Sequence, residues 1–182
     1  MLRVLAVLAI ASLASSDTLN EKRPELGQYQ DDGKCFPLKT SWHMMYRSFK
    51  TDPFFGNTAK CARFTGTSPV VNGSTEANIE FSPDGKSGIK IKLISSDGYT
   101  HKNVLRVSLK DLEEVSVDVS VAYVDCNVCK VLRHTYISKT ACSVLLPTTQ
   151  LHQPNTVCDF VYDLLCGTKK YQIYDDSCKT QN

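Results

Sequence analysis

The sequence predicts an all-β protein, an eight-stranded antiparallel up-and-down barrel with one α-helix near its C-terminus. Short strand-like segments recur between residues 41 and 146 with turn residues between them, a spacing typical of an all-β sandwich or barrel. No helical pattern separates these segments, so parallel βα units are excluded. An eight-stranded meander that closes into a barrel removes its sheet edges, and its interior can hold one small ligand.

A short leader precedes this domain. Met1-Leu2-Arg3 opens the chain, an apolar run extends from Val4 to Leu13, and Ala14-Ser15-Ser16 supplies small residues for cleavage. These features are typical of a secretory signal peptide, and the alternative is a buried N-terminal strand. We expect cleavage after Ser16 and one mature, secreted domain over residues 17–182.

The composition excludes several classes of protein. The 182 residues are 42% hydrophobic and 22% charged, as in an ordinary globular domain. The 21 basic and 19 acidic residues are spread along the chain and leave a net charge of +2, which does not indicate a nucleic-acid partner. The apolar run at the N-terminus is too short to span a bilayer, so we expect no membrane insertion.

The strands are expected from alternation and from turn signals. Ile89, Ile91 and Leu93 alternate with lysines, which is a clear period of two. In the first strand Trp42, Met44 and Tyr46 fall on one face. Asp84-Gly85 and Asp97-Gly98 mark turns. The expected strands cover residues 41–48, 60–65, 77–82, 88–95, 103–109, 114–123, 128–133 and 141–146.

One helix follows the strands. Asn155 or Thr156 can cap it, and Gly167 ends it. Val161, Leu164 and Leu165 give it an apolar stripe, and the segment 171–178 beyond it looks extended.

Eight cysteines lie in the mature part of the chain, at positions 35, 61, 126, 129, 142, 158, 166 and 178. An even number in a secreted protein indicates disulfides, although eight cysteines allow 105 pairings. Cys126 and Cys129 could instead suggest a metal or redox pair, but no second pair and no histidine spacing supports it. Asn72-Gly73-Ser74 is an acceptor sequence for N-glycosylation, which in a secreted protein marks a surface loop.

No catalytic motif is present in the sequence, and no cofactor is expected. Nucleophile-elbow, zinc-protease, phosphate-loop and dinucleotide-binding patterns are missing. Glu113-Glu114 with Asp111 could suggest a carboxylate pair, but neighbouring strand residues point to opposite faces. Asp175-Asp176 is expected at the surface. These observations favour a binding protein over an enzyme.

Several segments together resemble a known family. They are Leu26 to Asp31, the run Ser48-Phe49-Lys50-Thr51-Asp52-Pro53-Phe54-Phe55-Gly56-Asn57 with Cys61 beyond it, Ala122 to Asp125, Cys129 to Arg133, and Cys158 opening a helix with Cys178 near the chain's end. This pattern resembles the tick salivary lipocalins of the histamine-binding protein family across nearly the whole mature chain. The resemblance implies a barrel with the helix against its wall, secreted into the bite to sequester histamine, serotonin or leukotrienes, or to bind complement.

The resemblance also implies two disulfides, Cys61–Cys178 and Cys129–Cys158. The remaining four cysteines are extra to the family's usual bridges. We expect Cys126 to pair with Cys142, on neighbouring strands, and Cys35 to reach Cys166 on the helix.

Position by position, the resemblance implies a ligand site at Phe49, Asp52 and Phe55. The family's amine pattern has Cys-Asp where this chain has Cys129-Lys130, and a downstream glutamate that residues 142–146 lack. Ile89 stands where another interior carboxylate is expected, and Asp118 is the candidate substitute. Trp42, or its alternates Met45 and His43, is expected on the inner wall. Ordinary core packing is the alternative role for Phe49 and Phe55.

Two functions remain open for a monomeric protein of this kind. The first is sequestration of a small mediator, either an amine held by Asp52 or an amphipathic lipid whose head group meets Arg47, Arg106, Lys130 or Tyr46. The second is inhibition of a host protein, such as complement or a protease, through the loops of the barrel. Transport of the animal's own lipid is a background alternative to these two.

Overall fold

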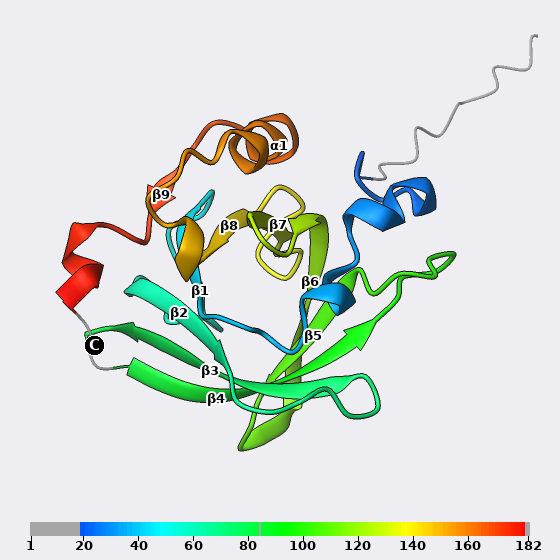
Figure 1. Cartoon of the computed structure of the whole chain (residues 1–182), viewed down its shortest axis with the longest axis horizontal. Coiled ribbons are helices and arrows are strands. Elements are labelled where there is room, and N and C mark those ends of the chain that lie inside the picture. Colours follow the sequence, from blue (N-terminus) through cyan, green and yellow to red (C-terminus); the bar gives the residue numbers. More distant parts are fainter. Residues whose placement is uncertain (1–18, 84, 181–182) are drawn as a thin grey trace, which may run out of the picture.

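The computed structural model describes residues 19–83 and 85–180, and the expected leader and its cleavage site lie outside them. Eight strands close an antiparallel barrel and a short ninth lies beside it, which confirms the expected fold (Figure 1). Their bounds are β1 Trp42–Arg47, β2 Lys60–Gly66, β3 Ser74–Ser82, β4 Gly85–Ile94, β5 Val104–Leu109, β6 Leu112–Asp125, β7 Cys129–Arg133, β8 Cys142–Pro147 and β9 Tyr171–Gln172.

The barrel closes where β1 pairs with β2. Each strand from β2 to β8 pairs with the next, and β1 completes the circle by pairing with both β8 and β2. The far half of β1 pairs with β9 instead of β2, at Tyr46 and Arg47. None of the described helices is long and apolar enough to cross a membrane.

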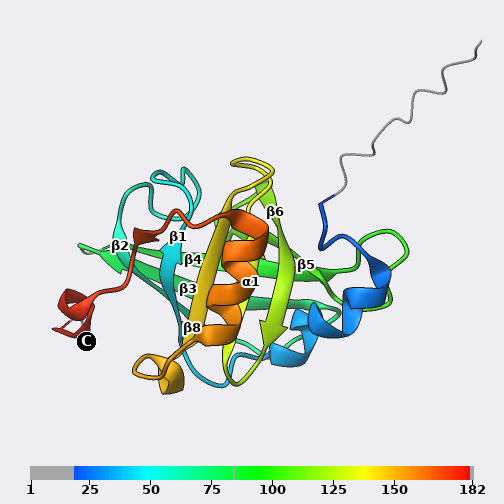
Figure 2. The ribbon, with the colours of Figure 1, turned by 90° about the horizontal axis from the view of Figure 1, so that it is seen from above.

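The helices lie outside the barrel. The α-helix α1 (Thr156–Cys166) packs against the outer wall, across β8, as Figure 2 shows. Two 3-10 helices, η1 (Pro24–Tyr29) and η2 (Asp32–Cys35), lie in the segment before β1, and two more, η3 (Thr148–Gln150) and η4 (Asp176–Thr180), lie in the last part of the chain.

The two ends of the barrel differ in how they are covered. At one end lie the first residues of β1 and the β6–β7 turn, and η2 packs there through a hydrogen bond from the Asp32 amide to the Lys102 carbonyl. We call this the closed end. At the other end the loops 48–59 and 134–141 approach each other, and we call it the mouth (Figure 2).

The alternation expected for β4 is confirmed. Ile89, Ile91 and Leu93 are buried in the barrel core, with exposed fractions of 1%, 5% and 6%. The expected single face of β1 is wrong at Tyr46. The pairing of β1 with β8 shifts between Met44 and Tyr46, and such a bulge turns the following side chain to the other face. Tyr46 therefore packs outside the barrel, edge-on against Tyr162 of α1.

The helix buries a different stripe from the one expected. Cys158 and Tyr162, one turn apart, are fully buried against the wall, while Leu164 is 69% exposed. Val161 and Leu165 are only partly buried in the same cluster. The two buried positions are spaced i and i+4, so they share the inner face and place Leu164 on the outer one.

All eight cysteines form disulfides. Cys61–Cys178 and Cys129–Cys158 agree with the pairs that the resemblance implies. The other two pairs are Cys35–Cys126 and Cys142–Cys166, so the expected pairing of Cys126 with Cys142 and of Cys35 with Cys166 is wrong. Cys142 on β8 lies opposite Arg133, the last residue of β7, whereas Cys126 lies in the turn before the first residue of β7. Cys142 therefore faces α1, and Cys126 faces η2.

Candidate functional site

The barrel encloses a narrow apolar cavity of about 50 Å³. It is lined by Phe36, Leu38, Trp42, Met44, Phe55, Phe64, Ile89, Ile91, Leu105, Val107, Val119, Lys130, Leu132, His134 and Leu145. An apolar cavity that accepts benzene measures about 150 Å³. A ligand larger than a few water molecules therefore requires lining side chains to move.

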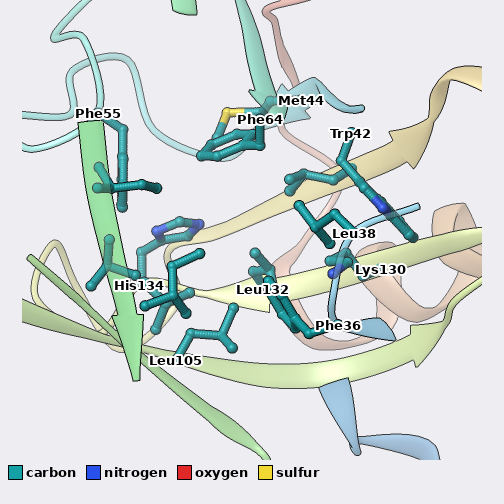
Figure 3. A pocket seen from close by; sticks show the side chains of 15 residues that line it. Phe36, Leu38, Trp42, Met44, Phe55, Phe64, Leu105, Lys130, Leu132 and His134 are labelled. Carbon is teal, nitrogen blue, oxygen red and sulfur yellow. The ribbon is translucent and has the colours of Figure 1, made fainter. Parts of the chain in front are cut away.

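Aromatic rings and one cation gather at the closed end of the cavity. Figure 3 shows Trp42, Phe36 and Lys130 together, with Phe55 and His134 toward the opposite side. The Nζ atom of Lys130 lies 4.2 Å from the centre of the Trp42 ring and 5.5 Å from that of Phe36. It donates a hydrogen bond of 2.7 Å to Oδ1 of Asp32 on η2. Both partners are buried, so the charge is neutralised inside the protein.

Asp52 does not line the cavity, although it is fully buried. Its Oδ1 accepts hydrogen bonds of 3.0 Å from the backbone amides of Phe54 and Phe55. The hydroxyl of Tyr136, across the mouth, donates to the same carboxylate at 3.0 Å from Oδ2, and Nη1 of Arg47 lies 3.9 Å from Oδ2. Asp52 therefore fixes the loop 48–59 and holds Phe55 in the cavity wall.

The mouth contains a chain of hydrogen bonds that ends at Asp52. The Tyr136 hydroxyl donates its proton to Asp52, so its oxygen can only accept from Nδ1 of His134, which lies 3.1 Å away. In neutral histidine the other ring nitrogen is then an acceptor, and Nε2 accepts a hydrogen bond of 2.7 Å from the Ser143 hydroxyl. Burial, with the nearby Arg47 and Arg133, lowers the pKa of His134 to about 3. His134 is thus neutral at physiological pH, as the hydrogen bond that its Nε2 accepts from Ser143 requires.

Trp42 and Phe55 line the cavity as expected, but Phe49 and Asp118 do not. The Phe49 ring packs on the Arg47 guanidinium at 5.0 Å and edge-on against the His134 ring at 5.3 Å, behind a residue that lines the cavity. The Asp118 side chain is 42% exposed and accepts two hydrogen bonds of 2.8 Å from Arg106, so it lies on the outer surface. Val117, Val119 and Val121 occupy the inner face of β6 instead.

Of the four groups expected to meet a ligand's head group, Lys130 alone lines the cavity, and it lies at the closed end. Arg106 is paired on the outside, and Arg47 donates to the carbonyls of Lys50 and Asn57 in the mouth loop. Tyr46 donates to Asp159 on α1.

Sequence reasoning missed His134 and Asp32. Lys130, Leu132 and His134 alternate with Val131 and Arg133, so period two alone would have placed His134 inside with Leu132. Asp32 lies in a polar segment without a period, and no local signal links it to Lys130, which is 98 residues away.

The wall suits an apolar ligand better than a cation. Among the described residues, none that lines the cavity is an aspartate or glutamate, and Lys130 is its only charged side chain. A buried ammonium ion without a carboxylate is costly, and the nearby carboxylate of Asp32 is already paired with Lys130, so a protonated amine finds no free carboxylate on this wall. No group of three or more metal-ligating side chains occurs in the described part of the chain.

One comparison with known proteins gives a match, and it covers the whole barrel domain. The family model for tick histamine binding protein matches residues 20–180, which is nearly the whole chain. No curated protein sequence matches the chain. Members of this family are binding proteins, and the four disulfides are typical of proteins from an oxidising compartment. The chain belongs to the tick histamine binding protein family.

Proposed function

We propose that this protein is a secreted salivary scavenger that holds a small, mostly apolar host mediator inside its barrel. The observation that carries the proposal is the cavity wall. It is apolar along its length, and its one charged side chain among the described residues, Lys130, is already paired with Asp32. A lipid mediator gains about 0.8 kcal/mol for each methylene that it buries on such a wall. Histamine gains little from it.

Entry of a ligand requires the mouth to open. Phe55 is the wall residue that the loop 48–59 supplies, and Asp52 and Tyr136 hold that loop closed. Displacing Phe55 and separating Phe54 from Tyr136 would connect the cavity with solvent, while the strands keep their pairing. The protein would then act stoichiometrically, because each barrel holds one ligand.

A side-by-side titration tests the proposal. Calorimetry of the mature protein with histamine, serotonin and a leukotriene should give binding for the leukotriene, and micromolar or weaker affinity for both amines. Native mass spectrometry of the secreted protein should show a retained apolar ligand when one is present, including a lipid of the animal itself. Nanomolar histamine binding would contradict the proposal.

A protein partner is the second candidate. The outer face of α1 exposes an apolar stripe, with Val157, Phe160 and Leu164 at 47%, 68% and 69% exposure. Residues with this spacing lie on one side of a helix, and exposed apolar surface of this kind marks many protein interfaces. If no small molecule binds, a pull-down of complement components and proteases from host plasma, with Phe160→Ser as the control, tests this function.

A further inference from the structure

The closed end of the cavity contains the groups that a protein uses to bind a primary amine. Such a site needs a carboxylate for the charge and aromatic faces for cation–π attraction. Asp32 supplies the carboxylate, with an exposed fraction of 0%, and Trp42 and Phe36 supply the rings. The three groups come from η2, β1 and the segment between them, and they surround one point.

The ammonium group of Lys130 occupies that point. Its nitrogen is 2.7 Å from Oδ1 of Asp32 and 4.2 Å above the Trp42 ring, and Asp32 is its only hydrogen-bond partner among the described residues. Lys130 reaches the site from β7, where it is 3% exposed. The lysine therefore makes the contacts that a bound alkylammonium ion would make.

The carboxylate of Asp32 can accept one more hydrogen bond than Lys130 donates to it. The other carboxylate oxygen of Asp32, Oδ2, is buried and has no hydrogen-bond partner within the described part of the chain. A carboxylate in the interior ordinarily accepts more than one hydrogen bond, because an unsatisfied buried acceptor is unfavourable. The Lys130 ammonium group thus uses only one of the two carboxylate oxygens of Asp32, and the other can accept a hydrogen bond from a further donor.

We propose that the closed end is a primary-amine site that Lys130 occupies from within the same chain. A side chain fixed on a strand competes at an effective concentration far above that of any free amine. The wild-type protein therefore rejects histamine at this site, although the carboxylate and the rings are present. Removal of the lysine side chain should uncover the site. This inference does not depend on the ligand proposed above.

Chemical rescue tests the inference directly. In Lys130→Ala the atoms beyond Cβ are removed, and n-propylamine carries the same heavy atoms as a free molecule. We expect the variant to melt below the wild type and n-propylamine at millimolar concentration to raise its melting temperature. n-Propanol, which has the same shape without the charge, should raise it much less. Histamine should bind the variant at least ten-fold more tightly than it binds the wild type by calorimetry.

Two controls separate this site from a general effect of amines. In the double variant Asp32→Asn, Lys130→Ala the carboxylate is gone, so the difference between n-propylamine and n-propanol should disappear. Lys90→Ala removes a strand lysine whose carboxylate partner, Glu113, is 2.9 Å away but at the surface. Neither additive should distinguish this variant from the wild type.

Equal responses of Lys130→Ala to n-propylamine and n-propanol would overturn the inference. If the variant does not fold by itself, its refolding yield in the presence of each additive is the measurement. A higher yield with the amine supports the site, and equal yields overturn it. Neither result tests the apolar-ligand proposal, which depends on the separate titration of the wild-type protein.

Discussion

Each end of the barrel buries one aspartate, and the two carboxylates differ in the groups that they bind. Asp32 at the closed end neutralises a buried ammonium ion beside two aromatic rings. Asp52 at the mouth accepts from two backbone amides and a tyrosine hydroxyl, and its nearest cation is 3.9 Å away. A buried carboxylate is therefore a candidate ligand anchor only where backbone donors do not already satisfy it. By this criterion Asp32 is the better candidate for a ligand anchor, because the hydrogen bonds of Asp52 already hold the mouth loop.

The largest expected effect is at the closed end. Asp32→Ala leaves the Lys130 ammonium buried without its partner, and loss of one member of a buried pair costs about 3–5 kcal/mol of folding free energy. Denaturant unfolding of the variant with its disulfides intact measures this loss. The double variant Asp32→Ala, Lys130→Met should recover a large part of it, because the unpaired charge is gone. A double variant no more stable than Asp32→Ala would show that the pair is not what stabilises this end.

The mouth should respond to acid. The pKa of His134 is lowered from 6.5 to about 3 in the folded protein, so the unfolded chain takes up a proton first as the pH falls. The stabilisation is complete above about pH 6.5 and is lost toward about pH 3, at up to about 1.4 kcal/mol per pH unit. From about pH 6.5 to about pH 4.5 the contribution of His134 to the unfolding free energy should fall by roughly 2–3 kcal/mol, and His43, whose pKa burial lowers to about 4, adds to the fall.

Replacing the histidine isolates that contribution from those of the carboxylates. Unfolding curves of His134→Gln at the same two pH values should show a smaller difference than the wild type. An unchanged difference would assign the acid sensitivity to other groups.

A smaller effect is expected at Asp52. Asp52→Asn keeps an oxygen for the amides of Phe54 and Phe55 but loses the charged acceptor of the Tyr136 hydroxyl, so we expect a loss of about 1–2 kcal/mol. Calorimetry with histamine and serotonin should show no loss of amine affinity that can be traced to this carboxylate. Asp118→Asn, on the outer surface, is the matched control and should cost less than about 1 kcal/mol. Amine binding that disappears only in Asp52→Asn would reverse the assignment of the two aspartates.

The sequence predicts the barrel well where alternation is uninterrupted. Ile89, Ile91 and Leu93 reach the core as expected, and the valines at 117, 119 and 121 would have placed Asp118 outside had their period been followed. Tyr46 could not be placed, because the bulge after Met44 depends on how β1 pairs with β8. The family resemblance supplied two disulfides, but strand order alone did not show that Cys126 and Cys142 lie at opposite ends of β7.

The site was harder to predict than the fold for a physical reason. The family resemblance implied Phe55, and the alternation of the first strand placed Trp42, and both residues line the cavity. Asp52 was expected to face a ligand, yet whether a carboxylate is free depends on the amides and hydroxyls around it. The link between Asp32 and Lys130 is made only when the N-terminal segment folds over the closed end, and no periodicity records such a contact.

The four disulfides cross-link only one side of the barrel. Cross-links begin or end on β2, β7, β8, α1 and the segments beside them, whereas β3, β4 and β5 contain no cysteine. Of these three strands, β4 contributes Ile89 and Ile91 to the cavity wall, and β5 contributes Leu105 and Val107. Substitutions there can reshape the pocket without disturbing the cross-linked frame. The architecture thus allows ligand preference to diverge between related proteins while the disulfide-linked scaffold stays the same.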